Sequence, residues 1–229
     1  MEQDSKKTKA TQDLIDRAFS GVLAPSLVDG LRKNPALMGL EGRKLYFTTM
    51  VTNIRGFESI RRSLDVGVFS FINDYFDVMS KIVLDNLGMI LFIEGDALIV
   101  TFGAPVPFTD HAFRACKAAC EMQQQLPAVS ERWKSKGVPP LEFGVGINTG
   151  EAFAGNGGWS DCVFYTVMGQ EVNVAARLER LTKKYGVSIC ITENTLRDAG
   201  DNVTVNRLGS VPIPLSPEPV TIYELAAIG

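Results

Sequence analysis

Three short stretches of the chain carry polar residues where chemistry could occur. The sequence EGDALIVTFG puts Asp96 at the tip of a hairpin between two apolar strands, and TNIRGF puts Asn53 at the end of an apolar run. The glycine that follows, Gly56, lets backbone N–H groups approach an anion. In GQEVNVAARLERL, Asn173 and Arg177 are four residues apart, so they share one face of a helix. An amide and a guanidinium in that register suit the binding of a phosphoryl group.

Each of these features also has an ordinary structural interpretation. Gly-Asp is a common pair in a tight hairpin turn. Asn173 and Arg177 could equally be a solvated surface pair, since long polar side chains are mostly exposed. Residue types alone therefore leave metal-binding, phosphate-binding and purely structural roles open.

The elements that must hold these residues follow from the hydrophobic pattern. A β-branched and aromatic run at 43–53 predicts a strand, and apolar residues spaced three and four apart predict a long amphipathic helix over 57–87. The other predicted elements are two strands in 89–103, a helix over 110–137, a strand pair in 141–156, an extended segment at 162–170, a helix over 171–186, and strands at 188–192 and 221–227 around a proline-rich hairpin at 211–219. The order β-α-β-β-α-β with an added strand-helix-strand unit predicts an α+β fold of ferredoxin-like type.

Composition limits the function classes. The chain has 229 residues, 45% of them apolar and 21% charged, which is ordinary for a globular protein with one sizeable core. A net charge of −3 argues against a nucleic-acid partner. Four cysteines without a CxxC pair, together with one histidine, do not make a usual zinc site. No apolar run approaches the roughly 20 residues of a membrane helix, so we expect no direct membrane insertion and a cytoplasmic location.

The chain divides into two unequal parts. Residues 1–42 begin with a polar lead and continue with short amphipathic segments at 11–23 and 25–34, which predicts an N-terminal helical linker. Residues 43–229 hold all the motifs and form the main domain. This arrangement would also fit the cytoplasmic part of a larger, membrane-bound or sensor-linked protein.

Five motifs in a fixed order identify a family. They are NIRGF, GDALIVTFGAP, DHAFRACKAACEMQQQL, GVGINTGEAFAGN and YTVMGQEVNVAARLERLTKKYGV. Together they closely resemble the catalytic domain of class III adenylyl and guanylyl cyclases of microbial type, over roughly residues 42–205. The resemblance implies the class III nucleotidyl cyclase fold and the conversion of ATP or GTP to a 3′,5′-cyclic monophosphate and pyrophosphate. It also implies a head-to-tail homodimer, or a heterodimer with another cyclase domain, whose sites take residues from both chains.

Four of the family's site residues are intact. In the family, two aspartates on one chain hold two divalent cations, Mg²⁺ or Mn²⁺, and the partner chain supplies a base-reading pair and an Asn-Arg pair that stabilises the transition state. By resemblance, Asp96 is the second metal aspartate, Thr166 is one base-reading residue, and Asn173 and Arg177 are the catalytic pair. The residues expected to contact the substrate through the loop after the first strand are Ile54, Gly56 and Phe57.

Three positions depart from the family's pattern. Asn53 stands where the first metal aspartate belongs, and Phe92 stands where the base-reading lysine or glutamate belongs. Glu58 replaces the usual small hydroxyl residue beside the phosphates. Mg²⁺ prefers charged oxygen ligands, and losing one preorganised charge typically costs about 3–4 kcal/mol, or about 10²–10³ in rate. Phe92 cannot hydrogen-bond a purine edge.

Two functions remain open on this evidence. Losses in both halves of the site favour a degenerate cyclase domain, a pseudocyclase that is inactive or very weak alone and acts as a regulatory nucleotide-binding dimer with one cation or none. The alternative is a slow cyclase that depends on Mn²⁺ or on a partner chain, with Glu58 substituting for the missing carboxylate. A diguanylate cyclase is disfavoured because the hairpin has no GGDEF-like sequence.

Overall fold

The computed structural model describes residues 9, 12–13, 15–16, 18–38, 42–159, 162–213 and 218–229. Its strands are β1 Arg43–Ile54, β2 Gly88–Glu94, β3 Ala97–Phe102, β4 Phe143–Trp159, β5 Cys162–Met168, β6 Ile189–Thr192, β7 Val203–Val211 and β8 Val220–Ile228. The helices are α2 Pro25–Lys33, α3 Phe57–Leu64, α4 Val68–Asp85, α5 His111–Lys134, α6 Gln170–Tyr185 and α7 Glu193–Ala199, with short 3₁₀ turns at Pro35–Met38, Asp65–Gly67 and Gly200–Asn202.

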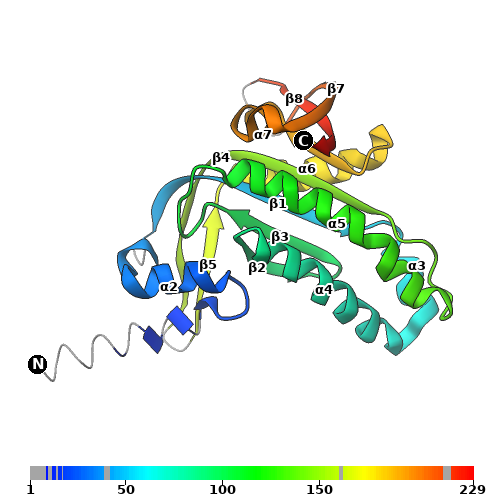
Figure 1. Ribbon diagram of the computed structural model, residues 1–229, viewed down its shortest axis with the longest axis horizontal. Coiled ribbons are helices and arrows are strands. Elements are labelled where there is room, and N and C mark those ends of the chain that lie inside the picture. The colour runs from blue at the N-terminus through cyan, green and yellow to red at the C-terminus, as the bar shows by residue number, and fades with distance from the viewer. Residues whose placement is uncertain are drawn as a thin grey trace, which may run out of the picture.

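A single sheet organises the described residues (Figure 1). Seven of its eight strands follow the order β2-β3-β1-β4-β6-β8-β7, and β5 pairs with β4 outside this path. β1 lies antiparallel between β3 and β4, which is the arrangement of a ferredoxin-like β-α-β-β-α-β core. The predicted α+β fold class with an added strand-helix-strand unit is therefore confirmed.

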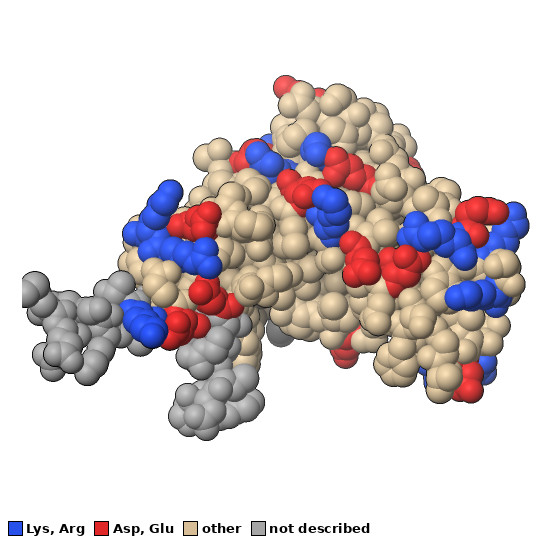
Figure 2. Space-filling view, turned by 60° about the horizontal axis from the view of Figure 1, so that its bottom comes forward, with Lys and Arg blue, Asp and Glu red and all other residues tan. Residues whose placement is uncertain are grey.

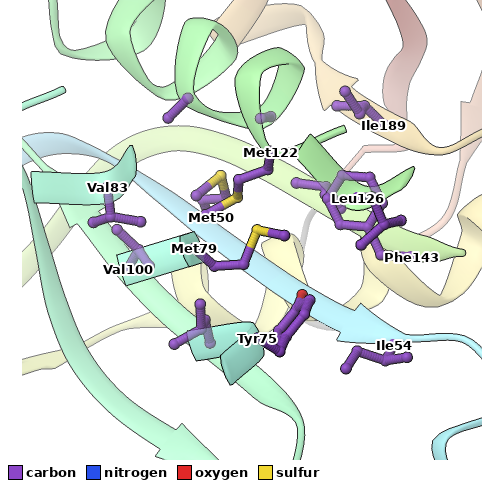
Figure 3. Packing of buried hydrophobic residues seen from close by; sticks show 14 of the residues in the cluster. Met50, Ile54, Tyr75, Met79, Val83, Val100, Met122, Leu126, Phe143 and Ile189 are labelled. Carbon is purple, nitrogen blue, oxygen red and sulfur yellow. The ribbon is translucent and has the colours of Figure 1, made fainter. Parts of the chain in front are cut away.

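Helices α4 and α5 cover one face of this sheet (Figure 1) and form the main core with it. In α4 the residues at every fourth position, Phe71, Tyr75, Met79 and Val83, are fully buried in the same core cluster as Met50 of β1, and Figure 3 shows Tyr75, Met79 and Val83 in this cluster. This spacing is the apolar stripe of an amphipathic helix. Burying side chains of this size stabilises the fold by about 1.5–3 kcal/mol each.

The opposite face of the sheet is covered by α6 and by the N-terminal residues. Helix α6 packs along β4 and β1. Beside it, Phe19 and Leu31 from the N-terminal region pack with Phe47 of β1 and Tyr165 of β5. The N-terminal region therefore packs on the same sheet as the rest of the chain.

Two sequence predictions were wrong in detail. The predicted strand pair in 141–156 is one continuous strand, β4, because its glycines lie under α6 rather than in a turn. The predicted helix over 57–87 is interrupted at Asp65–Gly67, where Asp65 has a positive φ of 49°. Helix α7 and strand β7, which pairs with β8, were not predicted. Residues 1–8 of the polar lead and residues 214–217 of the proline-rich hairpin lie outside the described residues.

The surface agrees with the mixed charge of the sequence. On the face in Figure 2, Lys and Arg side chains alternate with Asp and Glu, and this face carries no extended basic patch among its described residues. No helix in the described part of the chain is both long and apolar enough to cross a bilayer.

Candidate functional site

The turn between β2 and β3 brings Asp96 to the end of β1. Glu94-Gly95-Asp96 is the tight turn that the sequence predicted, with Gly95 at a φ of 63°. The Asp96 side chain is only 9% exposed, and its Oδ2 accepts a hydrogen bond from the Ile54 N–H at 2.7 Å. Burial raises the pKa of the Asp96 carboxyl, while hydrogen bonds from the Ile54 N–H and the Asn53 side chain lower it. Two residues 43 positions apart in the sequence, Asn53 and Asp96, are thus in contact.

Glu58 lies on the first turn of α3, turned toward the arginines of its own helix. Its carboxylate accepts two hydrogen bonds from Arg61, each at 2.8 Å, and one from Arg62 at 2.9 Å. These bonds, with Arg61 the largest contributor, lower the pKa of Glu58 to about 2. The spacing of three and four residues along one helix explains these pairings. The Glu58 carboxylate therefore forms its hydrogen bonds with Arg61 and Arg62 of its own helix.

The loop after β1 joins the strand to α3. Gly56 has a φ of 71°, a left-handed conformation that glycine adopts without strain, and it precedes the first residue of α3. The Ser59 N–H donates to the Gly56 carbonyl at 2.9 Å, which closes the first helical turn. Phe57 is partly buried against the core, and the Ile54 N–H is used by Asp96. In this loop the Ile54 N–H thus binds Asp96, and Gly56 lets the chain turn into α3.

Helix α6 presents Asn173 and Arg177 outward. Both residues are exposed, whereas Val174, Ala175 and Leu178 of the same helix are buried. The four-residue spacing predicted that the polar pair shares a face, and the structure places both residues on the exposed side of α6.

Thr166 lies in a pocket of about 530 Å³ at the junction of β1, β4 and β5. It pairs across the strands with Gly155, so no side chain of β4 stands opposite it. The lining residues are Gly42, Arg43, Lys44, Phe153, Ala154, Gly155, Asn156, Thr166 and Met168. Phe92 is not among them. It is 47% exposed on β2, just after a bulge that begins at Ile90.

Comparison with known proteins identifies the chain. The profile of the adenylate and guanylate cyclase catalytic domain matches residues 43–226. The chain belongs to this family. Adenylate cyclase 1 of Rhizobium meliloti (strain 1021) is 32% identical over 182 residues, covering 79% of this chain and 27% of the relative. Adenylate cyclase of Anabaena cylindrica is 30% identical over 233 residues, covering 96% of this chain and 44% of the relative.

The fold of this cyclase domain also matches solved structures. The crystal structure of the guanylyl cyclase Cya2 is 36% identical, with a TM-score of 0.76, and the match covers 82% of this chain and 95% of that one. The chain spans less than half the length of the two relatives named above. Members of the family use divalent metal ions, act on nucleoside triphosphates and work as dimers.

The residues at the expected metal position are one carboxylate, Asp96, and one amide, Asn53. Asp96 offers a carboxylate with one oxygen bonded to a backbone N–H, and Asn53 offers an amide that hydrogen-bonds to that carboxylate. An amide contributes one neutral oxygen where a second charged ligand would be needed to offset a second ion. No cluster of three or more His, Cys, Asp or Glu suited to a metal occurs among the described residues.

Sequence reasoning missed a second carboxylate near Asp96, that of the partly buried Glu179. It lies on the inward side of α6, where a Cβ on Gly144 would be 2.7 Å from Glu179 Oε1. Gly144 pairs directly with Asn53 in the β1–β4 register. Burial raises the pKa of Glu179 to about 7, with Arg180 lowering it and the nearby charge of Asp96 raising it further. The signal in the sequence was weak, because a glutamate two residues after Arg177 resembles an ordinary surface residue of an amphipathic helix.

Proposed function

We propose that this cyclase domain acts as a pseudocyclase: a head-to-tail homodimer in the cytoplasm that binds ATP or GTP and regulates cyclic-nucleotide signalling with little or no turnover. In this proposal Asn173 and Arg177 contact the nucleotide across the dimer interface, and Thr166 contacts the base. In the same proposal the domain binds no nucleic acid and does not insert directly into a membrane.

The contact between Asn53 and Asp96 carries the proposal. At the position of the family's first metal aspartate, Asn53 places a neutral amide near the Asp96 carboxylate, whose pKa it lowers. We propose that Asp96, with the amide oxygen of Asn53, holds one Mg²⁺ or Mn²⁺ at most. Such a cation would neutralise the triphosphate, while activation of the ribose 3′-hydroxyl would lack its second charged centre.

The base side of the site supports the same conclusion. Phe92 offers no hydrogen bond to a purine, and it lies outside the pocket that contains Thr166. Glu58 places a negative charge in the first turn of α3, close to where the loop Ile54, Gly56 and Phe57 would meet the phosphates. Its arginine partners offset this charge, so nucleotide binding remains compatible with Glu58.

A second candidate function rests on the intact α6 pair. Asn173 and Arg177 are both exposed and share one side of α6. In a heterodimer, this chain would lend them and Thr166 to a site whose metal carboxylates sit on the partner chain. The result would be a slow cyclase dependent on that partner, or on Mn²⁺, which tolerates imperfect sites better than Mg²⁺.

One assay separates the two functions. The purified domain is incubated with Mn²⁺ and ATP or GTP, nucleotide binding is measured by equilibrium dialysis, and cyclic product is quantified by mass spectrometry. We expect binding without cyclic product from the wild type, and weaker binding from Arg177→Ala. The triple variant Asn53→Asp/Glu58→Thr/Phe92→Lys tests whether the fold can still support turnover.

The outcomes are distinct. Cyclic product from the wild type that disappears in Arg177→Ala would refute the pseudocyclase and establish a slow cyclase. Product only after mixing with an active cyclase chain whose own Asn-Arg pair is disabled would establish the heterodimer. A wild type that binds neither nucleotide would refute the nucleotide-binding role altogether.

A further inference from the structure

Helix α6 rests on a strip of β4 that is almost without side chains. The residues of β4 on this face are Gly144, Gly146, Asn148, Gly150 and Ala152, at every second position. A Cβ on Gly144 would lie 2.6 Å from the Thr182 hydroxyl of α6, and a Cβ on Gly146 would overlap the helix backbone. The helix therefore lies against strand backbone. Few side chains of β4 interlock with α6 to fix its position along or around its axis.

Asn148 is the polar residue among these five residues of β4. It is 3% exposed, and its Nδ2 donates both to the Glu171 carboxylate and to the Glu171 backbone carbonyl, the latter at 3.3 Å. Glu171 is the second residue of α6, whose N-terminus has no side-chain cap. Gly150 leaves room for this contact, since a Cβ there would lie 2.8 Å from Glu171 Oε1. Asn148 thus holds the first turn of α6 by two hydrogen bonds.

The Asn148 amide is itself held by a buried chain of hydroxyl groups. Thr192 Oγ1 donates to Asn148 Oδ1 at 3.0 Å. From Thr192 the chain continues through Thr195, Thr149 and Thr48, with oxygen-to-oxygen distances of 2.8–3.0 Å. It ends at Nδ1 of His111, 2.8 Å from the Thr48 hydroxyl. All four threonines are at most 1% exposed. A fully paired buried network of this kind fixes the orientation of each member.

We propose that Asn148, acting through Glu171, is the positioning residue that sets the register of α6 and thereby places Asn173 and Arg177. Asn173 follows Glu171 by two residues and Arg177 by six. A slip of α6 by one residue along the glycine strip would shift the pair by about 1.5 Å and rotate it by about 100°. Displacements of this size remove the benefit of preorganised ligand contacts. The inference rests on the proposed function, in which this pair contacts the nucleotide.

The test compares variants that break the Asn148–Glu171 contact with one that breaks a contact elsewhere. Asn148→Ala and Glu171→Ala remove it, whereas Glu171→Gln keeps an oxygen that can accept from Asn148. The control is Asp74→Ala, because Asp74 accepts hydrogen bonds from Arg132 and Trp133 between α4 and α5, on the other face of the sheet. Three quantities are measured: Tm, the Kd for a fluorescent ATP analogue with Mn²⁺, and amide hydrogen exchange in residues 172–178.

We expect the two alanine variants to bind the analogue about tenfold more weakly and to exchange faster at residues 172–178. Glu171→Gln should bind within about twofold of the wild type. Asp74→Ala should lower Tm without changing Kd or exchange in this segment. The inference is overturned if the alanine variants bind the analogue like the wild type. It is also overturned if Kd rises in proportion to the fall in Tm in all four variants, Asp74→Ala included.

The exchange data separate this inference from the proposed function. If the wild type binds no nucleotide, the nucleotide-binding role fails, and the exchange measurement alone decides whether Asn148 positions α6. Faster exchange confined to residues 172–178 in the alanine variants would then support the inference. Exchange that is unchanged there, or raised throughout the domain, would overturn it.

Discussion

Replacing Asn53 by aspartate should make the protein less stable without metal and more responsive to Mn²⁺. In the wild type the Asn53 side chain hydrogen-bonds to the Asp96 carboxylate, which is only 9% exposed. A hydrogen bond to a charged group contributes about 1.5–3 kcal/mol. Asn53→Asp removes this bond and adds a like charge, so we expect a loss of about 2–3 kcal/mol at pH 7.5 in EDTA.

The loss corresponds to a measurable change in melting temperature. A domain of this size loses about 2–4 °C per kcal/mol, so Tm should fall by about 5–10 °C. Mn²⁺ at a hundred times its Kd would return about 2.7 kcal/mol, because the ion binds only the folded state. Thermal melts followed by circular dichroism, with EDTA and with Mn²⁺, measure both effects. Asn53→Ala is the matched control, since it loses the hydrogen bond without adding a ligand.

Two results would refute this reasoning. If Asn53→Asp melts with the wild type in EDTA, the side chains at positions 53 and 96 do not interact as the structure indicates. If Mn²⁺ raises the Tm of Asn53→Asp no more than that of Asn53→Ala, position 53 does not face a metal site.

Three further predictions concern packing and pH. Gly146→Ala should cost about 3 kcal/mol in urea unfolding, because the new Cβ would overlap backbone atoms of α6, whereas Gly30→Ala, which meets no atom within 4 Å in α2, should be neutral or stabilising. Glu179 has a pKa of about 7 in the folded protein, above its usual 4.5. Its contribution to stability is therefore present below pH 4.5 and is lost as pH rises through 7. Glu179→Gln should raise Tm more at pH 8 than at pH 5. Burial lowers the pKa of His111 below its usual 6.5. Its contribution to the stability of the fold is therefore present above pH 6.5 and is lost as pH falls. His111→Asn should make the decrease in Tm between pH 7.5 and pH 5 smaller than in the wild type.

Local pattern predicted most elements because each signal lies within a few residues. The four-residue apolar spacing from Phe71 to Val83 gave α4, and the Gly95 turn gave the β2–β3 hairpin. The glycines between 144 and 158 misled the prediction of β4, since a glycine in a turn and a glycine under a helix look alike in sequence. Only the packed helix shows that Gly146 is required for close approach rather than for a turn.

The sequence by itself determined the family and the identity of the unusual residues. Ordered motifs and spacing were enough to match Asn53, Asp96, Asn173 and Arg177 to their positions, because these matches depend on residue type and order. Tertiary structure decided how those residues are held. The nearness of Asn53 to Asp96 depends on the pairing of β1 with β3, and the bond from Asn148 to Glu171 depends on α6 packing against the glycines of β4. Such contacts join residues more than twenty positions apart, and no local pattern in the chain encodes them.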